Sequence, residues 1–154
     1  MIFSLFGTSM LPFYRLAAEL DRLAGDRHLE IVVQNGNTHY NFKNCRAIPF
    51  MPHEEVLDKI RESEFVICQA GAGSMADGIE CGKIVIAVPR RLEFGETAAE
   101  QDSLANALDE LGCIMLAANP EDIAKKIDGI KDFVPNRPPK NNIPRIIAKY
   151  LSEI

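Results

Sequence analysis

Short apolar runs alternate with helical patterns along the chain, and this alternation limits the fold more than any other feature. The predicted strands are Ile2–Phe6, Leu29–Gln34, Arg46–Pro49, Phe65–Cys68, Ile84–Val88 and Ile114–Leu116. The predicted helices are Pro12–Ala24, Glu54–Glu62, Ser74–Cys81, Thr97–Leu111 and Glu121–Ile130, with Gly25, Gly82 and Gly112 as C-terminal caps. The pattern indicates an α/β fold, a Rossmann-like parallel sheet of about six strands with helices on both faces.

The C-terminal part of the chain departs from this alternation. The 154 residues suit a single domain, and residues 132–142 form a polar, proline-rich stretch that we interpret as a connector. Beyond it, apolar residues recur at helical spacing and predict a final amphipathic helix over 143–154. The stripe consists of Ile143, Ile146, Ile147, Tyr150, Leu151 and Ile154. We expect it to contact a partner protein, with packing on its own sheet as the alternative.

Composition excludes several classes of function. Seventeen Lys and Arg against 22 Asp and Glu give a net charge of −5, which disfavours binding to nucleic acid or an anionic bilayer. The four cysteines and three histidines lack metal-ligand spacing, so we expect reduced thiols and no metal site. Because no apolar run approaches the roughly 20 residues that cross a membrane, we expect a cytoplasmic protein.

One loop carries the clearest functional signal. The sequence Gln69-Ala70-Gly71-Ala72-Gly73-Ser74 follows a predicted strand and begins a predicted helix. Its glycines permit close approach of a ligand, Ser74 offers a capping hydroxyl, and the free amides of the helix start attract a phosphate. An ordinary tight turn is one alternative. Gly71–Ala76 also fits a dinucleotide-binding fingerprint, but it follows the fourth predicted strand and is followed by Arg90 and Arg91 where an acidic residue is needed.

At this loop the sequence resembles the C-terminal, donor-binding domain of family 28 glycosyltransferases. The resemblance rests on residues 69–74, Gly82-Lys83, Val88-Pro89-Arg90, Glu96, and Gln101 with Leu104-Ala105, and it extends to Phe6-Gly7-Thr8, Pro12-Phe13 and Gln34–Thr38. The chain is similar to the small soluble subunits of split UDP-sugar transferases, namely the dolichol-linked GlcNAc transferase and bacterial exopolysaccharide or capsule counterparts. The resemblance implies the C-terminal half of a GT-B fold.

The resemblance also implies a set of donor-binding residues. Gln69, Gly71, Ala72, Gly73 and Ser74 would surround the diphosphate with help from Arg90, and Asp77 would accept hydrogen bonds from the ribose. Gln101, aided by Glu96, would hold the sugar, Phe50 and Met51 would pack on uracil, and Gly7, Thr8 and Ser9 would face the cleft. Each has a structural alternative: Asp77 and Glu96 as solvated charges, Gln101 as an exposed helical residue, Phe50 and Met51 as core, and the arginines as surface residues.

Three positions depart from the family pattern. Gln69, Thr97 and Glu100 stand where the family usually has histidine, and neither glutamine nor threonine is a general base near neutral pH. The catalytic residue is therefore unassigned, with Glu96 as the one candidate on this chain and the base expected from a partner.

Together these features predict the donor-binding subunit of a two-component, metal-independent glycosyltransferase that needs no cofactor. A UDP-sugar would be the donor, and a membrane-anchored subunit would bind a lipid-linked acceptor in polysaccharide synthesis and hold this chain at the inner face of the membrane. The alternatives are a non-catalytic module that binds a sugar nucleotide or stabilises a partner, and a stand-alone nucleotide-binding protein.

Overall fold

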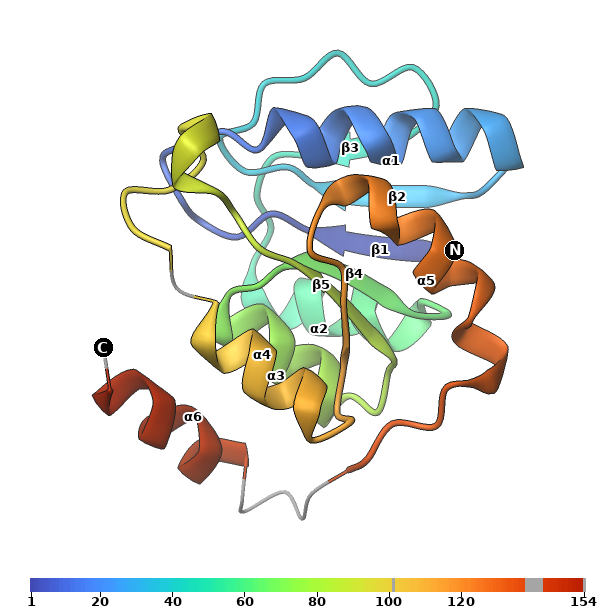
Figure 1. Ribbon diagram of the computed structural model, residues 1–154. Helices are drawn as coiled ribbons and strands as arrows, with labels where there is room; N and C mark the ends of the chain where they lie inside the picture. Colours follow the sequence, from blue (N-terminus) through green and yellow to red (C-terminus); the bar gives the residue numbers. More distant parts are fainter. Residues whose placement is uncertain (101, 138–142, 154) are drawn as a thin grey trace.

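A single parallel sheet forms the centre of the molecule. The computed structural model describes residues 1–100, 102–137 and 143–153, and its six strands have the order β3-β2-β1-β4-β5-β6 (Figure 1). The strands are β1 (Ile2–Leu5), β2 (Ile31–Gln34), β3 (Arg46–Ile48), β4 (Val66–Gln69), β5 (Val85–Val88) and β6 (Met115–Leu116). All six predicted strands are confirmed. The strands β1, β2, β4 and β5 are almost completely buried, as expected of apolar runs in a sheet covered on both faces, whereas β3 at the edge is largely exposed.

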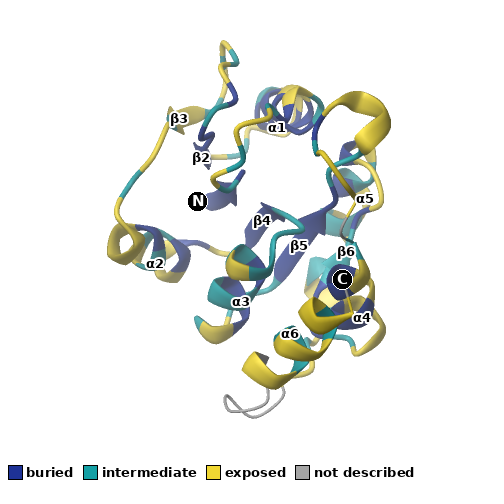
Figure 2. Cartoon of the chain, turned by 90° about the vertical axis from the view of Figure 1, so that its left-hand side faces the viewer, coloured by how far each residue is buried: buried dark blue, intermediate teal, exposed yellow. Residues whose placement is uncertain are grey.

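Helices cover both faces of this sheet. They are α1 (Tyr14–Arg27), α2 (His53–Glu62), α3 (Ala72–Glu80), α4 (Ser103–Glu110), α5 (Ile123–Asp128) and α6 (Ile143–Ser152), with short 3-10 helices η1 (Leu92–Phe94), η2 (Pro120–Asp122) and η3 (Ile130–Asp132). The apolar sides of α1 and α5 pack on one face, and those of α2, α3 and α4 on the other. Figure 2 shows the central strands buried between these layers. The predicted Rossmann-like architecture is confirmed.

Three predicted helix boundaries are wrong. Helix α1 does not end at Gly25 but runs to Arg27, and His28 takes the left-handed conformation at φ 53°. Gly25 makes room for the Asn44 side chain, whose Nδ2 would lie 2.8 Å from a Cβ there. The helix predicted from Thr97 begins only at Ser103, and the one predicted over Glu121–Ile130 is divided among η2, α5 and η3. Gly82 and Gly112, at φ 75° and 71°, do cap α3 and α4.

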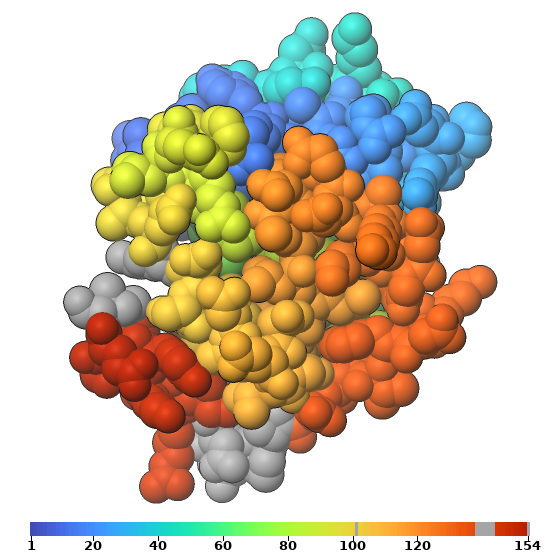
Figure 3. Space-filling model, in the orientation of Figure 1, coloured from blue at the N-terminus to red at the C-terminus, as the bar shows by residue number. Residues whose placement is uncertain are grey.

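The C-terminal helix packs on its own domain. Ile146, Ile147 and Tyr150 are half-buried against the core beneath α4, and the space-filling view shows α6 lying against α4 (Figure 3). Leu151 is 52% exposed. Packing on the chain's own domain, the alternative to contact with a partner, therefore describes three of the four stripe residues whose side chains the structure describes. The Ile143 side chain and Ile154 lie outside the described residues.

The predicted connector is only partly free of the domain. Asn136 donates a backbone hydrogen bond to the Gly112 carbonyl, and the Arg137 guanidinium donates to the Gly82 carbonyl. Residues 138–142 lie outside the described part of the chain. Among the described helices, none combines the length and the apolar character that a membrane-spanning segment needs.

Candidate functional site

A pocket of about 510 Å³ opens at the carboxyl edge of the sheet. It lies where the strand order reverses between β1 and β4, the place where open parallel sheets bind their ligands. We call it the larger pocket. Its walls come from the ends of β1 and β2, the start of α2, and the β4–α3 loop. The predicted donor-binding residues that line it are Gly7, Thr8, Met51, Gln69, Gly71, Ala72, Gly73, Ser74 and Asp77.

The start of α3 forms the centre of this pocket. The helix begins at Ala72 with Gly71 as its N-cap. Ser74 therefore lies within the first turn, and the prediction that it caps the helix is wrong. The first bond of the helix runs from the Met75 amide to the Gly71 carbonyl, at 3.1 Å. The preceding amides of residues 72–74 have no acceptor within the helix, and together with the helix dipole they favour an anion in the pocket.

Gly73 leaves this helix start open. A Cβ at Gly73 would meet no atom within 4 Å, whereas a Cβ at Gly78 would lie 2.5 Å from Val85 Cγ2. Packing against β5 therefore requires glycine at position 78, but packing within the fold does not require it at 73. The open space above Gly73 is suited to a ligand that approaches the backbone closely.

A histidine without a role in the sequence analysis lies beside the predicted ribose contact. His53 Nε2 is 3.0 Å from Asp77 Oδ2, and both residues line the larger pocket. The Asp77 side chain is 23% exposed and that of His53 is 65% exposed, so the carboxylate is accessible from the pocket. The signal that could have found His53 is its place between the third predicted strand and the next predicted helix, at the carboxyl edge of the sheet.

A smaller pocket of about 220 Å³ adjoins the larger one. The two share Gln69, Gly71 and Ala72 as a common wall. The far side of the smaller pocket is formed by the loop after β5, including Thr97, Ala99 and Asp102, and by Leu151 of α6; Ser9 also lines it. Gln101 lies outside the described residues, between two residues of this lining.

Arg90 joins the loops around both pockets. Its guanidinium donates to Gln69 Oε1 at 2.5 Å and to the carbonyls of Phe6 (2.8 Å), Leu11 (2.8 Å) and Glu96 (3.0 Å). Burial lowers the pKa of Arg90 from its ordinary value. Most N–H groups of its guanidinium therefore already donate hydrogen bonds within the protein. Arg90 positions the loops and supplies positive charge, whereas the sequence had predicted direct hydrogen bonds from it to a diphosphate.

The same hydrogen bonds explain Gly7 in the loop after β1. Gly7 has a φ of 72°, and a Cβ there would overlap the Gln69 amide. Glycine therefore allows the β1 loop to pass under the Gln69 side chain that Arg90 holds.

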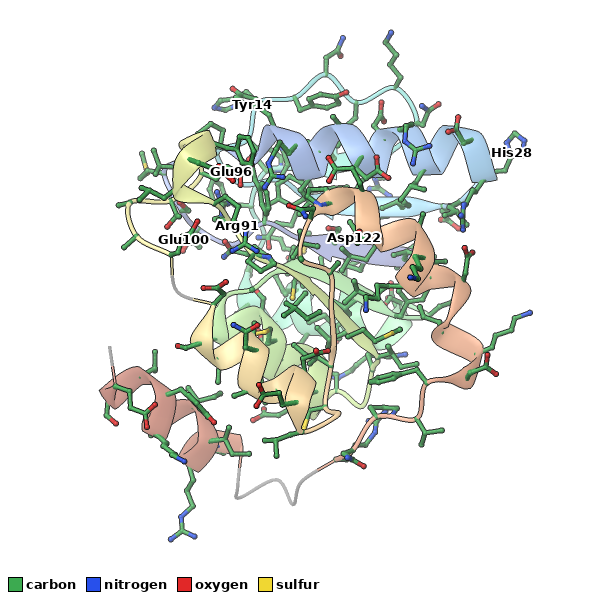
Figure 4. The ribbon with its side chains drawn as sticks, viewed as in Figure 1. Tyr14, His28, Arg91, Glu96, Glu100 and Asp122 are labelled. Atoms are coloured by element: carbon green, nitrogen blue, oxygen red, sulfur yellow. The ribbon has the colours of Figure 1, made fainter. Side chains whose placement is uncertain are left out.

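Glu96 serves the fold and lines neither pocket. It is 2% exposed, and its oxygens accept hydrogen bonds from Arg15 at 2.7 and 3.0 Å and from the Arg91 amide at 2.8 Å. These bonds to Glu96 raise the pKa of the Arg15 guanidinium. Figure 4 shows Glu96 beside Arg91 and Glu100. Its position does not match the expectation that Glu96 holds a sugar or acts as a catalytic carboxylate, because the carboxylate is already fully paired.

The remaining predicted residues divide between pocket and surface. Met51 lines the larger pocket, but Phe50 does not, and its side chain is 51% exposed and is therefore not core. Arg91 is paired with Asp102 at 3.0 Å.

The part of the chain that the structure describes has no cluster of His, Cys, Asp and Glu suited to a metal ion. Burial raises the pKa of the Cys45 and Cys68 thiols to about 12.

Comparison with known proteins gives one family and one fold. The sequence model of the glycosyltransferase family 28 C-terminal domain matches residues 6–146. A search of curated protein sequences gave no match.

Among solved structures, the glycotransferase of kitacinnamycin superposes with a TM-score of 0.64 at 12% identity, over 99% of this chain and 39% of that one. UDP-GlcNAc 2-epimerase from Neisseria meningitidis, bound to UDP-GlcNAc, gives 0.61 at 13%, over 99% and 44%. MurG from Acinetobacter baumannii gives 0.53 at 18%, over 87% and 41%. The chain thus spans about two-fifths of each of these structures, and the likeness is one of fold.

Proposed function

The chain belongs to the family of glycosyltransferase family 28 C-terminal domains, and from this membership we propose that it binds a UDP-sugar and serves in transfer of the sugar. The observation that carries the proposal is the open start of α3 at the reversal of strand order, where residues 72–74, whose amides have no acceptor within the helix, line the larger pocket. A nucleoside diphosphate carries two or more negative charges, which a helix start binds without a metal ion.

The two pockets suggest how one donor would lie. Their shared wall, Gln69 to Ala72, would flank the diphosphate, so that the nucleoside occupies the larger pocket and the sugar the smaller one. Asp77 would accept hydrogen bonds from ribose hydroxyls, and Met51 would contact the base. Gln101, which lies outside the described residues, stays a prediction as a contact of the sugar.

The chemistry would be displacement at the anomeric carbon. The bond between that carbon and the diphosphate oxygen breaks, the acceptor oxygen forms the new bond, and the nucleoside diphosphate leaves. The amides of the α3 start would stabilise the charge that develops on the leaving group, and Arg90 would add positive charge nearby. No cofactor takes part in this scheme.

We place the acceptor half and the general base on a membrane-anchored partner that binds a lipid-linked acceptor for polysaccharide synthesis. One observation supports a base from elsewhere: none of the three histidines is among the residues lining the smaller pocket in the described structure. The partner would hold the chain at the cytoplasmic face of the membrane. Exposed side chains of α6, such as Leu151, are candidate contacts.

A non-catalytic role is the second candidate. Its specific support is the absence of a titrating imidazole at Gln69, Thr97 and Glu100. Such a module would bind the sugar nucleotide without taking part in catalysis. Its complex with the partner, supplied in turn with each donor that binds, would then transfer no sugar.

Calorimetric titration of the full chain with UDP, UDP-sugars and NAD tests the proposal. We expect UDP and at least one UDP-sugar to bind and NAD not to bind. Asp77→Ala should weaken UDP binding about tenfold, because it removes a charge-assisted contact. The control Asp58→Ala, which removes an exposed carboxylate paired with Arg61 on α2, should bind as wild type. Tight NAD binding, or no UDP binding with or without the partner, would contradict the proposal.

A further inference from the structure

Gln34 is a buried amide that faces the larger pocket. It ends β2, where its register partner is Leu5 of β1. Paired residues of neighbouring strands point to the same face of a sheet, and both of these line the larger pocket. Gln34 is only 7% exposed. Its side-chain amide forms no hydrogen bond with any residue that the structure describes, and its atoms are not among the fully enclosed polar atoms that lack a partner, so the amide is open to the pocket.

Three apolar side chains line the same pocket: Leu5, Met51 and Val56, of which Leu5 and Val56 belong to the core beneath it. The fold leaves the donor and the acceptor of the Gln34 amide unpaired, and both are accessible from a pocket that is otherwise formed by the ends of strands and helices. A few polar groups placed in this way in a pocket fix the orientation of a ligand, so the position of Gln34 indicates a binding role.

We propose that Gln34 is a specificity-determining residue that hydrogen-bonds to the nucleobase of the donor; this inference rests on the proposed function. The phosphates would lie at the start of α3, and the ribose beside Asp77. Gln34 lies with Met51 and α2 in the part of the pocket nearer β2. With the phosphates and the ribose placed beside α3, this part of the pocket remains for the base.

The chemistry of the amide agrees with this position. A glutamine amide presents a donor and an acceptor side by side, and the edge of uracil presents a carbonyl acceptor next to an N–H donor. The two groups can form a pair of hydrogen bonds. A phosphate has only acceptors and is already provided for by the α3 amides.

The variant Gln34→Met, of similar length and volume but without the amide, tests the proposal. Affinity for UDP and for pyrophosphate is measured by calorimetry, and the thermal midpoint is measured without ligand. We expect the variant to bind UDP at least tenfold more weakly than wild type and pyrophosphate within twofold of it. Its midpoint should be close to that of wild type, because the amide forms no hydrogen bond within the fold.

Three results would overturn the inference. Unchanged UDP affinity would show that the base does not contact Gln34. Equal weakening for UDP and pyrophosphate would assign the amide to the phosphates. A lower thermal midpoint would show that Gln34 supports the fold. If wild type binds pyrophosphate but not UDP, the proposed function fails as well, so failure of the function and failure of the residue's role are distinguishable.

Discussion

The imidazole Nε2 of His53 lies 3.0 Å from the Asp77 carboxylate and joins the start of α2 to the middle of α3 across the larger pocket. Asp77 is therefore already oriented when the pocket is empty. A ribose that hydrogen-bonds to this carboxylate would share it with the imidazole or displace it.

Replacing His53 tests which of the two residues contacts the ligand. Because the pair is largely exposed, we expect His53→Ala to change the free energy of unfolding by only about 0.5 kcal/mol. UDP affinity should stay within threefold of wild type, since Asp77 remains. Urea unfolding and calorimetric titration measure both quantities. A loss of UDP affinity greater than that of Asp77→Ala would mean that His53 itself is the main contact.

The two glycines of α3 should respond in opposite ways to alanine. Gly73→Ala places a methyl group in open space and should stabilise the protein by up to about 1 kcal/mol, as alanine does in helices, while weakening UDP binding by obstructing the helix start. Gly78→Ala would force a Cβ onto Val85 and should cost about 1–3 kcal/mol. Thermal unfolding and UDP titration of both variants provide the measurements. Gly73→Ala with full UDP affinity would contradict a ligand at that position.

Arg90 should prove to be a positioning residue. Its Nε and Nη donors hold Gln69 and three carbonyls, so Arg90→Gln should destabilise the protein by about 3 kcal/mol and lower the thermal midpoint by roughly 10 °C. Arg90→Lys should rescue little, because an ammonium group cannot reproduce the planar fork. Arg61→Gln, on the exposed side of α2, is the control. Full stability of Arg90→Lys would show that charge alone suffices.

Glu96 should matter for stability and not for donor binding. Glu96→Gln leaves the Arg15 guanidinium without its ion pair in a largely buried place, at a cost of about 3 kcal/mol. UDP affinity, measured well below the unfolding temperature, should match wild type because Glu96 lines neither pocket. A stable variant that no longer binds a UDP-sugar would restore the assignment that the sequence suggested.

The features of the fold that follow from local sequence patterns could be predicted, and those that depend on contacts between distant residues could not. The six strands and the caps at Gly82 and Gly112 follow from apolar runs and glycine positions. Gly25 did not act as a cap because Asn44, distant in sequence, occupies the adjacent space. The role of Glu96 depends on Arg15, 81 positions away, and an ion pair of that separation leaves no pattern in the sequence.

The same distinction holds for the site. The glycine loop and Asp77 lie within one short segment and were predicted together. Gln34 and His53 reach the larger pocket from β2 and α2, and only the parallel register and the position of α2 bring them to α3. A polar residue at the end of an apolar strand is the signal that could have pointed to Gln34, but it was not used as one.

Amide chemical shifts of the ¹⁵N-labelled full chain, followed during titration with UDP, show whether the start of α3 binds the diphosphate of a UDP-sugar. We expect saturable changes that are largest at Ala72, Gly73 and Ser74, with smaller changes at Asp77. Saturable UDP binding with these amides unmoved, or no binding at millimolar UDP, would contradict this expectation.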